Sequence, residues 1–441
     1  MHHIPHVFLP RRTLLALTLC VCGVPAAFAQ QAAPETIDDL RKELAALRAE
    51  QAERDQRIQR LEEALQRITG TAAPAVASTP APVAPSSTST SPSATATVAT
   101  TTPRLIMSGD LRLRTQGDRS DDDGKNRGSM QVRGRIGATF TVNERVTIGA
   151  RLATGDGDDP NSTDVQLSNW LDDLDVSLDM AYAQFNFGNL TLYGGKIPQP
   201  FVRTDLVWDG DMNPQGVGAT WRKPLAGGGS LRANGLAFVV DESATGPDST
   251  MLGAQLGYES PAHGDWKFDV HGAYYHYDLG SVAGADSGDF RSNLRDASGN
   301  YLSRFQLANL LLGIGWNGLG ERWPLRLVGD YVRNTGAATD ADTGFGADLI
   351  LGKASARGDW RFTYGYAQTD ADAVLAAFSH DNIGIATNYR LHALTAEYVP
   401  WKSTTLGAIW YHYRPNDPVW AGSNAPGDWL DRFRLYLMLS F

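Results

Sequence analysis

The sequence predicts an all-β fold, a 16-stranded antiparallel transmembrane β-barrel that is preceded by an N-terminal α-helical coiled coil. Three observations lead to this fold class. Residues 104–441 contain sixteen segments in which apolar and polar side chains alternate, the connections between them alternate between long and short, and a seven-residue apolar repeat runs through residues 37–68. Alternation with a period of two is typical of strands that have one apolar and one polar face.

Composition excludes several other classes of protein. The 441 residues carry 39 Lys and Arg against 49 Asp and Glu, and the net charge of −10 disfavours sequence-independent nucleic-acid binding, which needs a basic surface. Beyond the N-terminus no apolar run reaches the roughly 18 residues of a transmembrane helix. The two cysteines, Cys20 and Cys22, lie near the N-terminus, so neither a disulfide framework nor a cysteine metal cage is expected in the rest of the chain.

Residues 1–29 are predicted to be a signal peptide. Two arginines precede an apolar run from Leu14 to Cys22, and Ala27 and Ala29 supply the small residues of a signal-peptidase site. The alternative, a helix that anchors the chain in a membrane, needs about 20 apolar residues, and Pro25 ends this run early. The chain is therefore expected to be exported and cleaved after Ala29.

Residues 35–69 are predicted to form a periplasmic coiled coil, because apolar residues recur at positions a and d of five heptads, with only Gln51 and Arg54 as exceptions. Those ten positions are Ile37, Leu40, Leu44, Leu47, Gln51, Arg54, Ile58, Leu61, Leu65 and Ile68. Isoleucine at both a and d favours three strands, and hence a homotrimer. A single amphipathic helix on a globular surface is the alternative, but residues 70–103 are mostly Ala, Pro, Ser and Thr, which predicts a linker without a core.

The connections within residues 104–441 indicate a barrel in the outer membrane. The stretches 154–179 and 197–215 are long, whereas 143–145 and 188–189 are short, and this alternation continues along the chain. Outer-membrane barrels have short periplasmic turns and longer extracellular loops. We therefore expect this barrel to contact outer-membrane lipid and to have both of its ends on the periplasmic side.

The last predicted strand, Arg432–Phe441, alternates strictly and ends on Phe. It resembles the C-terminal signature of Gram-negative outer-membrane β-barrels, which the barrel-assembly machinery recognises, so Phe441 is the expected assembly signal. With the signal peptide, the Gly-rich strands and the strand count, the chain resembles the general porin superfamily. Residues 194–201, Gly-Gly-Lys-Ile-Pro-Gln-Pro-Phe, are similar to the strand-then-Pro-Phe segment of the phosphate-selective-type and related putative porins.

The face opposite the apolar one is expected to line a water-filled pore. Seven arginines occupy this phase in the first three strands and the last strand, and barrel closure pairs the last strand with the first. The expected pore-lining residues are Arg112, Arg114, Arg133, Arg135, Arg151, Arg432 and Arg434. Each would cost about 2–4 kcal/mol at the lipid-facing midplane, and in the pore they would favour anions. The alternative is a structural role in salt bridges with inward acids such as Asp110 or Asp330.

In sixteen-stranded porins, which the chain resembles, the third long external loop folds inward and narrows the pore. The corresponding constriction loop is 197–215, whose charged residues Arg203, Asp205, Asp209 and Asp211 would face the arginines. Opposed charges would create a transverse field that favours small hydrophilic solutes. The preceding acidic loop, 154–179, is expected to be a solvated acidic surface rather than a calcium site, because it lacks the EF-hand spacing.

No catalytic motif is found, and neither a cofactor nor a metal site is expected. The sequence therefore predicts an outer-membrane porin for passive diffusion of small hydrophilic solutes or ions, with an anion preference at the basic wall. The alternative is a structural outer-membrane anchor whose coiled coil contacts the cell wall and spaces the periplasm. An enzyme is not expected.

Overall fold

The computed structural model describes residues 104–441, with gaps at 121–125, 156, 158–160, 169–172, 245, 281–291 and 421–428. The predicted signal peptide, coiled coil and linker lie outside the described residues, and they stay predictions. Within the described part of the chain, no helix is both long enough and apolar enough to cross a membrane.

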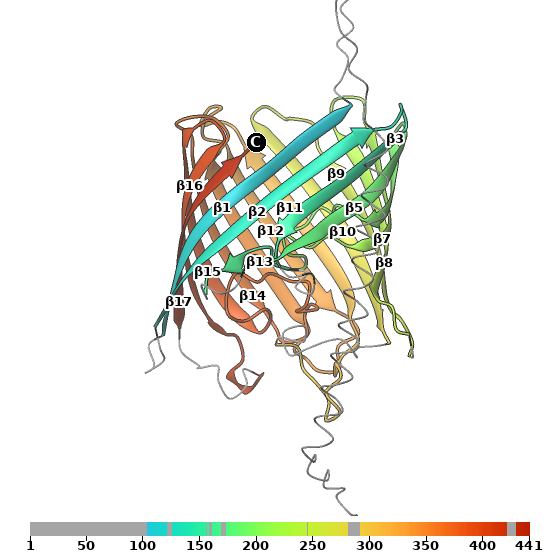
Figure 1. Ribbon diagram of the computed structural model, residues 1–441, viewed down its shortest axis with the longest axis vertical. Coiled ribbons are helices and arrows are strands. Elements are labelled where there is room, and N and C mark those ends of the chain that lie inside the picture. The colour runs from blue at the N-terminus through green and yellow to red at the C-terminus, as the bar shows by residue number, and fades with distance from the viewer. Residues whose placement is uncertain are drawn as a thin grey trace, which may run out of the picture. The chain divides into compact units, whose positions relative to one another are not determined.

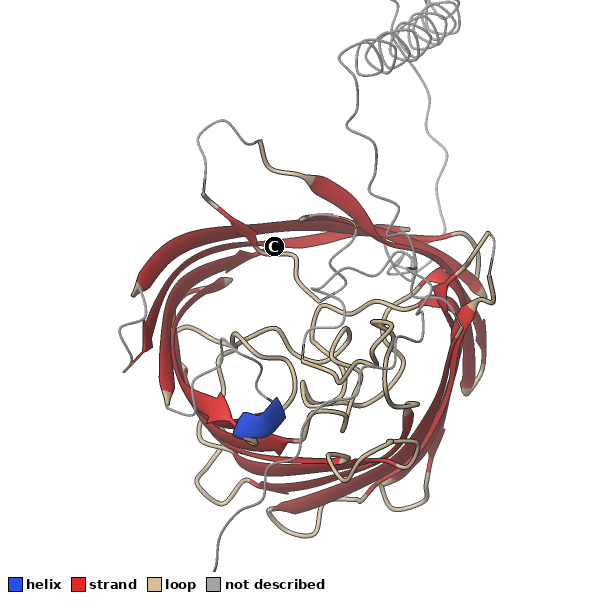
Figure 2. Ribbon diagram, turned by 90° about the horizontal axis from the view of Figure 1, so that it is seen from below, coloured by secondary structure: helices blue, strands red, loops and turns tan. Residues whose placement is uncertain are grey.

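The described residues form a single antiparallel sheet that closes on itself, because β17 pairs with β1 (Figures 1 and 2). The strands are β1 (Leu105–Ser120), β2 (Arg127–Thr141), β3 (Val146–Thr154), β4 (Val165–Gln166), β5 (Val176–Phe187), β6 (Leu190–Lys196), β7 (Gln215–Pro224), β8 (Ser230–Asp241), β9 (Ser249–Glu259), β10 (Trp266–Leu279), β11 (Gln306–Trp316), β12 (Leu325–Asn334), β13 (Thr343–Gly352), β14 (Trp360–Thr369), β15 (Tyr389–Trp401), β16 (Thr404–Pro415) and β17 (Leu430–Ser440). A short 3-10 helix, Pro418–Trp420, precedes β17.

Two of these strands share one position in the wall, so the barrel has the sixteen positions that the sequence predicts. β3 pairs with the second half of β2, and β4 then pairs with Val132 and Gln131 in the same direction. The described residues between them, 155, 157 and 161–164, lie outside the wall, and we call this segment the excursion.

Short turns and long loops lie at opposite ends of the barrel, as predicted. The turns at 188–189 and 402–403 lie at the end where β1 begins and β17 finishes (Figure 1). The tight turns use left-handed backbone conformations at Gly188 and Ser403. β1 and β2 extend beyond their predicted bounds, so the first long connection shrinks from the predicted 115–128 to 121–126.

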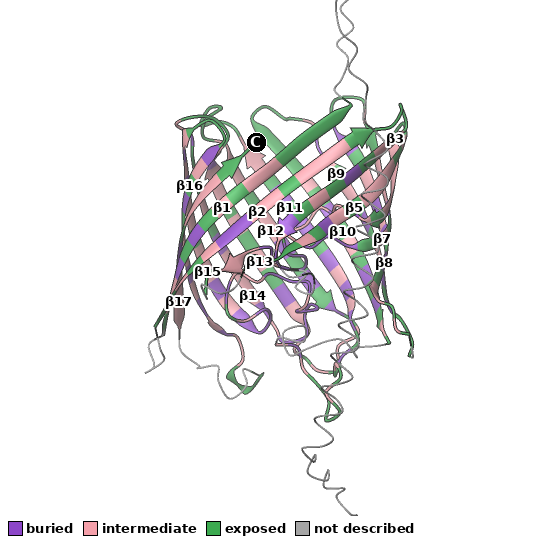
Figure 3. Cartoon of the chain, viewed as in Figure 1, coloured by how far each residue is buried: buried purple, intermediate pink, exposed green. Residues whose placement is uncertain are grey.

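The two faces of the wall differ in polarity, as the alternation predicts. Along β1, Leu111 and Leu113 are 39% and 46% exposed. Arg114, which lies between Leu113 and the exposed Thr115, is only 7% exposed. Figure 3 shows this alternation of exposed and buried residues along the strands. On the outer face near the short turns, Trp360 stacks on Tyr398 with ring centroids 4.6 Å apart, an arrangement typical of an interfacial aromatic girdle.

A hydrophobic cluster lies inside the barrel, where two loops fold into the lumen (Figure 2). They are the constriction loop, residues 197–214 as the strands bound it, and a second inner loop, residues 370–388. Trp208 of the first is fully buried and stacks on Phe378 of the second, with centroids 5.9 Å apart. Trp208 also meets Tyr275 of β10 edge to face at 5.5 Å. The two loops therefore pack on each other and on one side of the wall.

Glycines allow the constriction loop to leave the wall. Gly195 and Gly216 are paired across β6 and β7, and both have positive φ angles, 117° and 142°. A Cβ atom at either position would also collide with a carbonyl oxygen, of Ala181 and of Ala237 respectively. The Gly-Gly of the predicted motif thus lets the chain turn inward at mid-wall.

Replacing Gly195 with Ala should destabilise the folded barrel by about 1–3 kcal/mol, because an L-residue at this φ is strained and its Cβ meets backbone. The temperature at which the barrel loses its folded mobility in an SDS gel measures the effect. The matched control is Gly194→Ala, since a Cβ there meets nothing within 4 Å. Equal unfolding temperatures of the two variants would contradict the proposed requirement for glycine at position 195.

Candidate functional site

The seven predicted arginines lie together on the inner face of β1, β2, β3 and β17, and we call them the arginine wall. Its members are Arg112, Arg114, Arg133, Arg135, Arg151, Arg432 and Arg434. Pairing of β1 with both β2 and β17 brings them together, since Arg112 is opposite Arg133 and Gln116 is opposite Arg434. Residues more than 300 positions apart in the sequence thereby share one surface.

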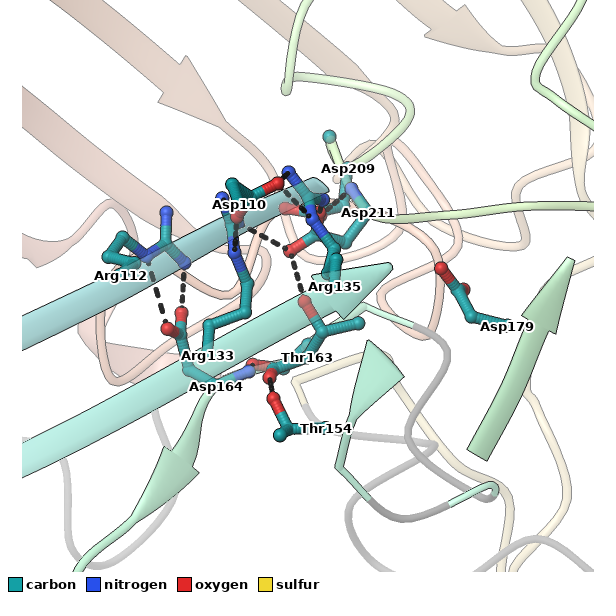
Figure 4. A network of polar contacts seen from close by, with 12 residues as sticks. Asp110, Arg112, Arg133, Arg135, Thr154, Thr163, Asp164, Asp179, Asp209 and Asp211 are labelled. Atoms are coloured by element: carbon teal, nitrogen blue, oxygen red, sulfur yellow. Dashed lines mark hydrogen bonds and ion pairs between the residues drawn. The ribbon is translucent and has the colours of Figure 1, made fainter. Parts of the chain in front are cut away.

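Two of these arginines lie between carboxylates from the wall and from the constriction loop (Figure 4). Arg135 contacts Asp110 of β1 and Asp211 of the loop, both at 2.8 Å. Arg133 lies 2.9 Å from Asp110 and 3.5 Å from Asp211. The constriction loop is therefore fixed to the arginine wall, close to its return to β7, by charge-assisted hydrogen bonds.

The excursion supplies a third carboxylate to the arginine wall. Asp164 forms an ion pair with Arg112 and another with Arg114, the latter at 2.8 Å. Its neighbour Thr163 donates a hydrogen bond to Asp211 at 3.2 Å, and Asn161 donates one to the carbonyl of Ser379 in the second inner loop at 2.7 Å. The expectation of a solvated acidic surface is wrong for Asp164, whose side chain is almost fully buried.

The remaining arginines have partners of their own. Arg151 pairs with Asp179 of β5, and Arg432 pairs with Asp118 of β1 at 2.6 Å. Arg434 has no carboxylate within ion-pair distance among the described residues, but it donates to Gln116 and to the Asn382 side chain, at 2.8 and 2.9 Å. Six of the seven guanidiniums therefore contact five carboxylates, which neutralise most of the wall's charge.

Three charged residues of the constriction loop stabilise the loop itself or face the lumen. Arg203 donates to the carbonyls of Trp208 and Gly210, at 3.2 and 2.9 Å. Asp205 is exposed to the lumen and lies 3.7 Å from Arg203. Asp209 is buried, and its N–H donates to the carbonyl of Phe378 at 2.8 Å. Burial, and then the charge of Asp205, raise the pKa of the Asp209 carboxyl above its ordinary value.

An open cavity of about 490 Å³ lies beside the constriction loop, against β10 to β16. Its lining includes Asp205, Asp269, Asp330 and Asp348. Asp269 pairs with Arg326 at 2.9 Å, and Asp330 accepts hydrogen bonds from Thr204 and Asn309. Neither Asp330 nor Asp348 has a cation within ion-pair distance in the described ranges. Because the lining also holds Arg203 and Arg326, this side of the lumen is acidic only on balance, and at β16 it adjoins the arginine wall.

The sequence does not predict the partners that come from the excursion and the second inner loop. Asp164 and Asn382 lie in segments whose composition is typical of external loops. Two features could have indicated their position. Inward arginines need counter-charges, and the apolar run 373–378 is unusual for a solvent-exposed loop.

Replacing Asp164 with Asn should lower the free energy of unfolding by about 3 kcal/mol, because it leaves Arg112 and Arg114 buried without their counter-charge. Denaturant unfolding of the detergent-solubilised protein, followed by circular dichroism, measures this loss. Asp173→Asn is the matched control, since Asp173 lies in the connection between β4 and β5 and is exposed. A loss no larger than that of the control would show that Asp164 is dispensable.

Residues 121–309 match the family described as "Putative porin". No curated protein matches the chain.

Several solved structures are similar to the chain, each over 76% of its length. OprB of Pseudomonas putida has 12% identity and a TM-score of 0.51 over 94% of its own chain. OmpF of Salmonella typhi has 14% identity and a TM-score of 0.48 over 97% of its chain. In-vitro folded OmpT of Vibrio cholerae, solved in a trimer form, has 12% identity and a TM-score of 0.45 over 99% of its chain.

At such identities the likeness to OprB concerns the fold alone. The family match is independent of this likeness, because it rests on sequence. It spans β2 to β10 and part of β11. The two findings confirm the resemblance predicted from the sequence: residues 121–309 are similar to the putative porin family, and the described residues have a porin-type β-barrel fold.

Proposed function

We propose that the chain forms a water-filled channel through which small hydrophilic solutes and ions diffuse passively. The observation that carries this proposal is the charged lining of the lumen, with an arginine wall on one side and an acidic cavity of about 490 Å³ on the other. Charged groups of this density need water around them, and a barrel with sixteen strand positions is wide enough for an aqueous channel. The family and the fold favour a channel over an enzyme.

The two sides of the lumen would impose a transverse field on a passing solute. Arg434, Arg114 and their neighbours lie on β1, β2 and β17, whereas Asp330 and Asp348 lie on β12 and β13 across the barrel. Such a field orients dipolar solutes. It disfavours apolar solutes, because they displace ordered water without replacing its electrostatic interactions with the wall. We therefore propose small polar molecules as the permeating class.

We propose an anion preference that is weaker than the one expected from the sequence. Asp110, Asp118, Asp164, Asp179 and Asp211 contact the arginine wall and cancel most of its charge. The acids of the open cavity oppose what remains. We propose that selectivity between anions and cations depends on the balance of the two sides.

Assembly and partners are further parts of the proposal. A homotrimer is supported by the isoleucine-rich heptads and agrees with the trimer form in which OmpT of Vibrio cholerae was solved. The outward apolar face would contact lipid, and Phe441, whose N–H donates to the Gly109 carbonyl at 3.0 Å, would be the signal read by the barrel-assembly machinery. The coiled coil would extend into the periplasm, reinforce the trimer or contact the cell wall.

Two charge-removing variants test the field in planar bilayers. Replacing Arg112, Arg133 and Arg434 with Ser should move the reversal potential in a KCl gradient toward the potassium equilibrium potential. Replacing Asp205 and Asp348 with Asn should move it toward that of chloride. The shifts are opposite because each variant removes one sign of charge from the lumen.

Asp173→Asn, which alters an exposed residue of an external connection, is the control and should leave the reversal potential unchanged. Only protein that keeps its folded mobility in an SDS gel is compared. An unaltered reversal potential in both charge variants would refute the proposed transverse field across the lumen. If the folded oligomer gives no conductance steps at all, the channel proposal fails, and the alternative of a structural anchor with a coiled-coil spacer takes its place.

A further inference from the structure

A second, smaller cavity lies between the start of the constriction loop and the lumen face of β6, β7 and β8. Its volume is about 270 Å³, below the roughly 300–1,000 Å³ of sites for drug-sized ligands. Gln199 of the Pro-Phe motif lines it from the loop, and Arg222, Arg232 and Asn234 line it from the wall. None of these four residues lines the larger cavity.

The polar groups of this cavity have unused hydrogen-bonding capacity. Both amide atoms of Gln199, the Oδ1 of Asn234 and the Nε of Arg232 are buried, and within the described part of the chain none of these atoms has a partner. Buried polar atoms in native proteins are almost always hydrogen-bonded. Four unsatisfied atoms around one cavity therefore indicate an occupant that supplies both donors and acceptors.

The orientation of Asn234 is fixed by its neighbour Gln255. Gln255 accepts a hydrogen bond from the N–H of Val202 at 2.9 Å and donates one to the Val202 carbonyl at 2.7 Å. This backbone pairing determines which end of the Gln255 amide is the oxygen. Asn234 must then turn its amide nitrogen toward that oxygen, at 3.1 Å, which leaves its own Oδ1 as a free acceptor for the cavity.

The cavity also carries an excess of one positive charge. Arg222 and Arg232 share a single carboxylate, that of Glu259, at 2.7 and 3.4 Å. The Nε–H of Arg232 takes no part in this pair and remains a donor. One uncompensated guanidinium matches a monoanion better than a dianion such as phosphate, whose second charge would have no counterpart.

We propose that this cavity binds a small carboxylate that carries hydroxyl groups, such as a sugar acid. The carboxylate would accept from the Arg232 Nε–H and from the amide nitrogen of Gln199. The hydroxyls would donate to the Asn234 Oδ1 and to the amide oxygen of Gln199. This inference rests on the proposed channel function, since the site lies in the lumen and a solute reaches it by diffusion.

Calorimetric titration of the detergent-solubilised folded protein tests the site with three probes. Gluconate carries both features, acetate carries only the charge and glucose carries only hydroxyls. We expect gluconate to bind about tenfold or more tightly than either, and Gln199→Leu and Asn234→Ala each to weaken it by about tenfold, as the loss of a hydrogen bond to a charged or buried group does. Thr363→Val, which alters the lining of the larger cavity, should not change it.

Equal binding of the three probes, or gluconate binding that survives both substitutions, would overturn the proposal and leave water as the occupant. A variant that fails to fold is identified by its mobility in an SDS gel, and Gln199→Glu then serves as a replacement of similar size, which should repel gluconate. Bilayer recordings separate this outcome from the channel function. Conductance without gluconate binding overturns the site alone, whereas gluconate binding without conductance overturns the channel alone.

Discussion

The closure of the sheet between β1 and β17 is the constraint on which the rest of the structure depends. A bilayer offers no hydrogen-bond partners, so every backbone group of a spanning sheet must pair within the sheet. The pairing runs from Asp110 opposite Ser440 to Ser120 opposite Leu430 and leaves no open edge. It also brings the inward arginines of the first and last strands onto one surface, where their charges have to be matched.

The need for counter-charges connects the wall to the loops. Of the five carboxylates that contact the arginine wall, Asp110, Asp118 and Asp179 belong to strands, but Asp164 and Asp211 come from segments that have turned into the lumen. The loops are held on the other side by the cluster around Trp208. Ion pairs with the arginine wall and apolar packing against β8 to β12 thus fix the same loop, and the space left beside it is the proposed channel.

The fold was largely predictable from the sequence, because the alternation of apolar and polar side chains along a strand indicates which face is apolar and which lines the lumen. The predicted strands 325–334 and 360–369 coincide with β12 and β14. β1 continues past its predicted end because its last residues need not be apolar where a strand projects beyond the bilayer. The inward phase of the arginines also followed from the pattern. Their pairing with Asp164 did not, because the polar, turn-forming composition of the excursion gives no indication of direction.

The proposed channel requires that the lumen face of the wall contacts water while the adjacent outward face contacts lipid. Neighbouring positions on β14 test it directly, since Thr363 lines the larger cavity and Tyr364 is exposed on the outer face. Single cysteines at these positions, with Cys20 and Cys22 replaced by Ser, are treated in lipid vesicles with a charged thiol reagent that does not cross membranes. We expect rapid labelling at 363 and little at 364. Protection of 363, or equal labelling of both positions, would contradict it.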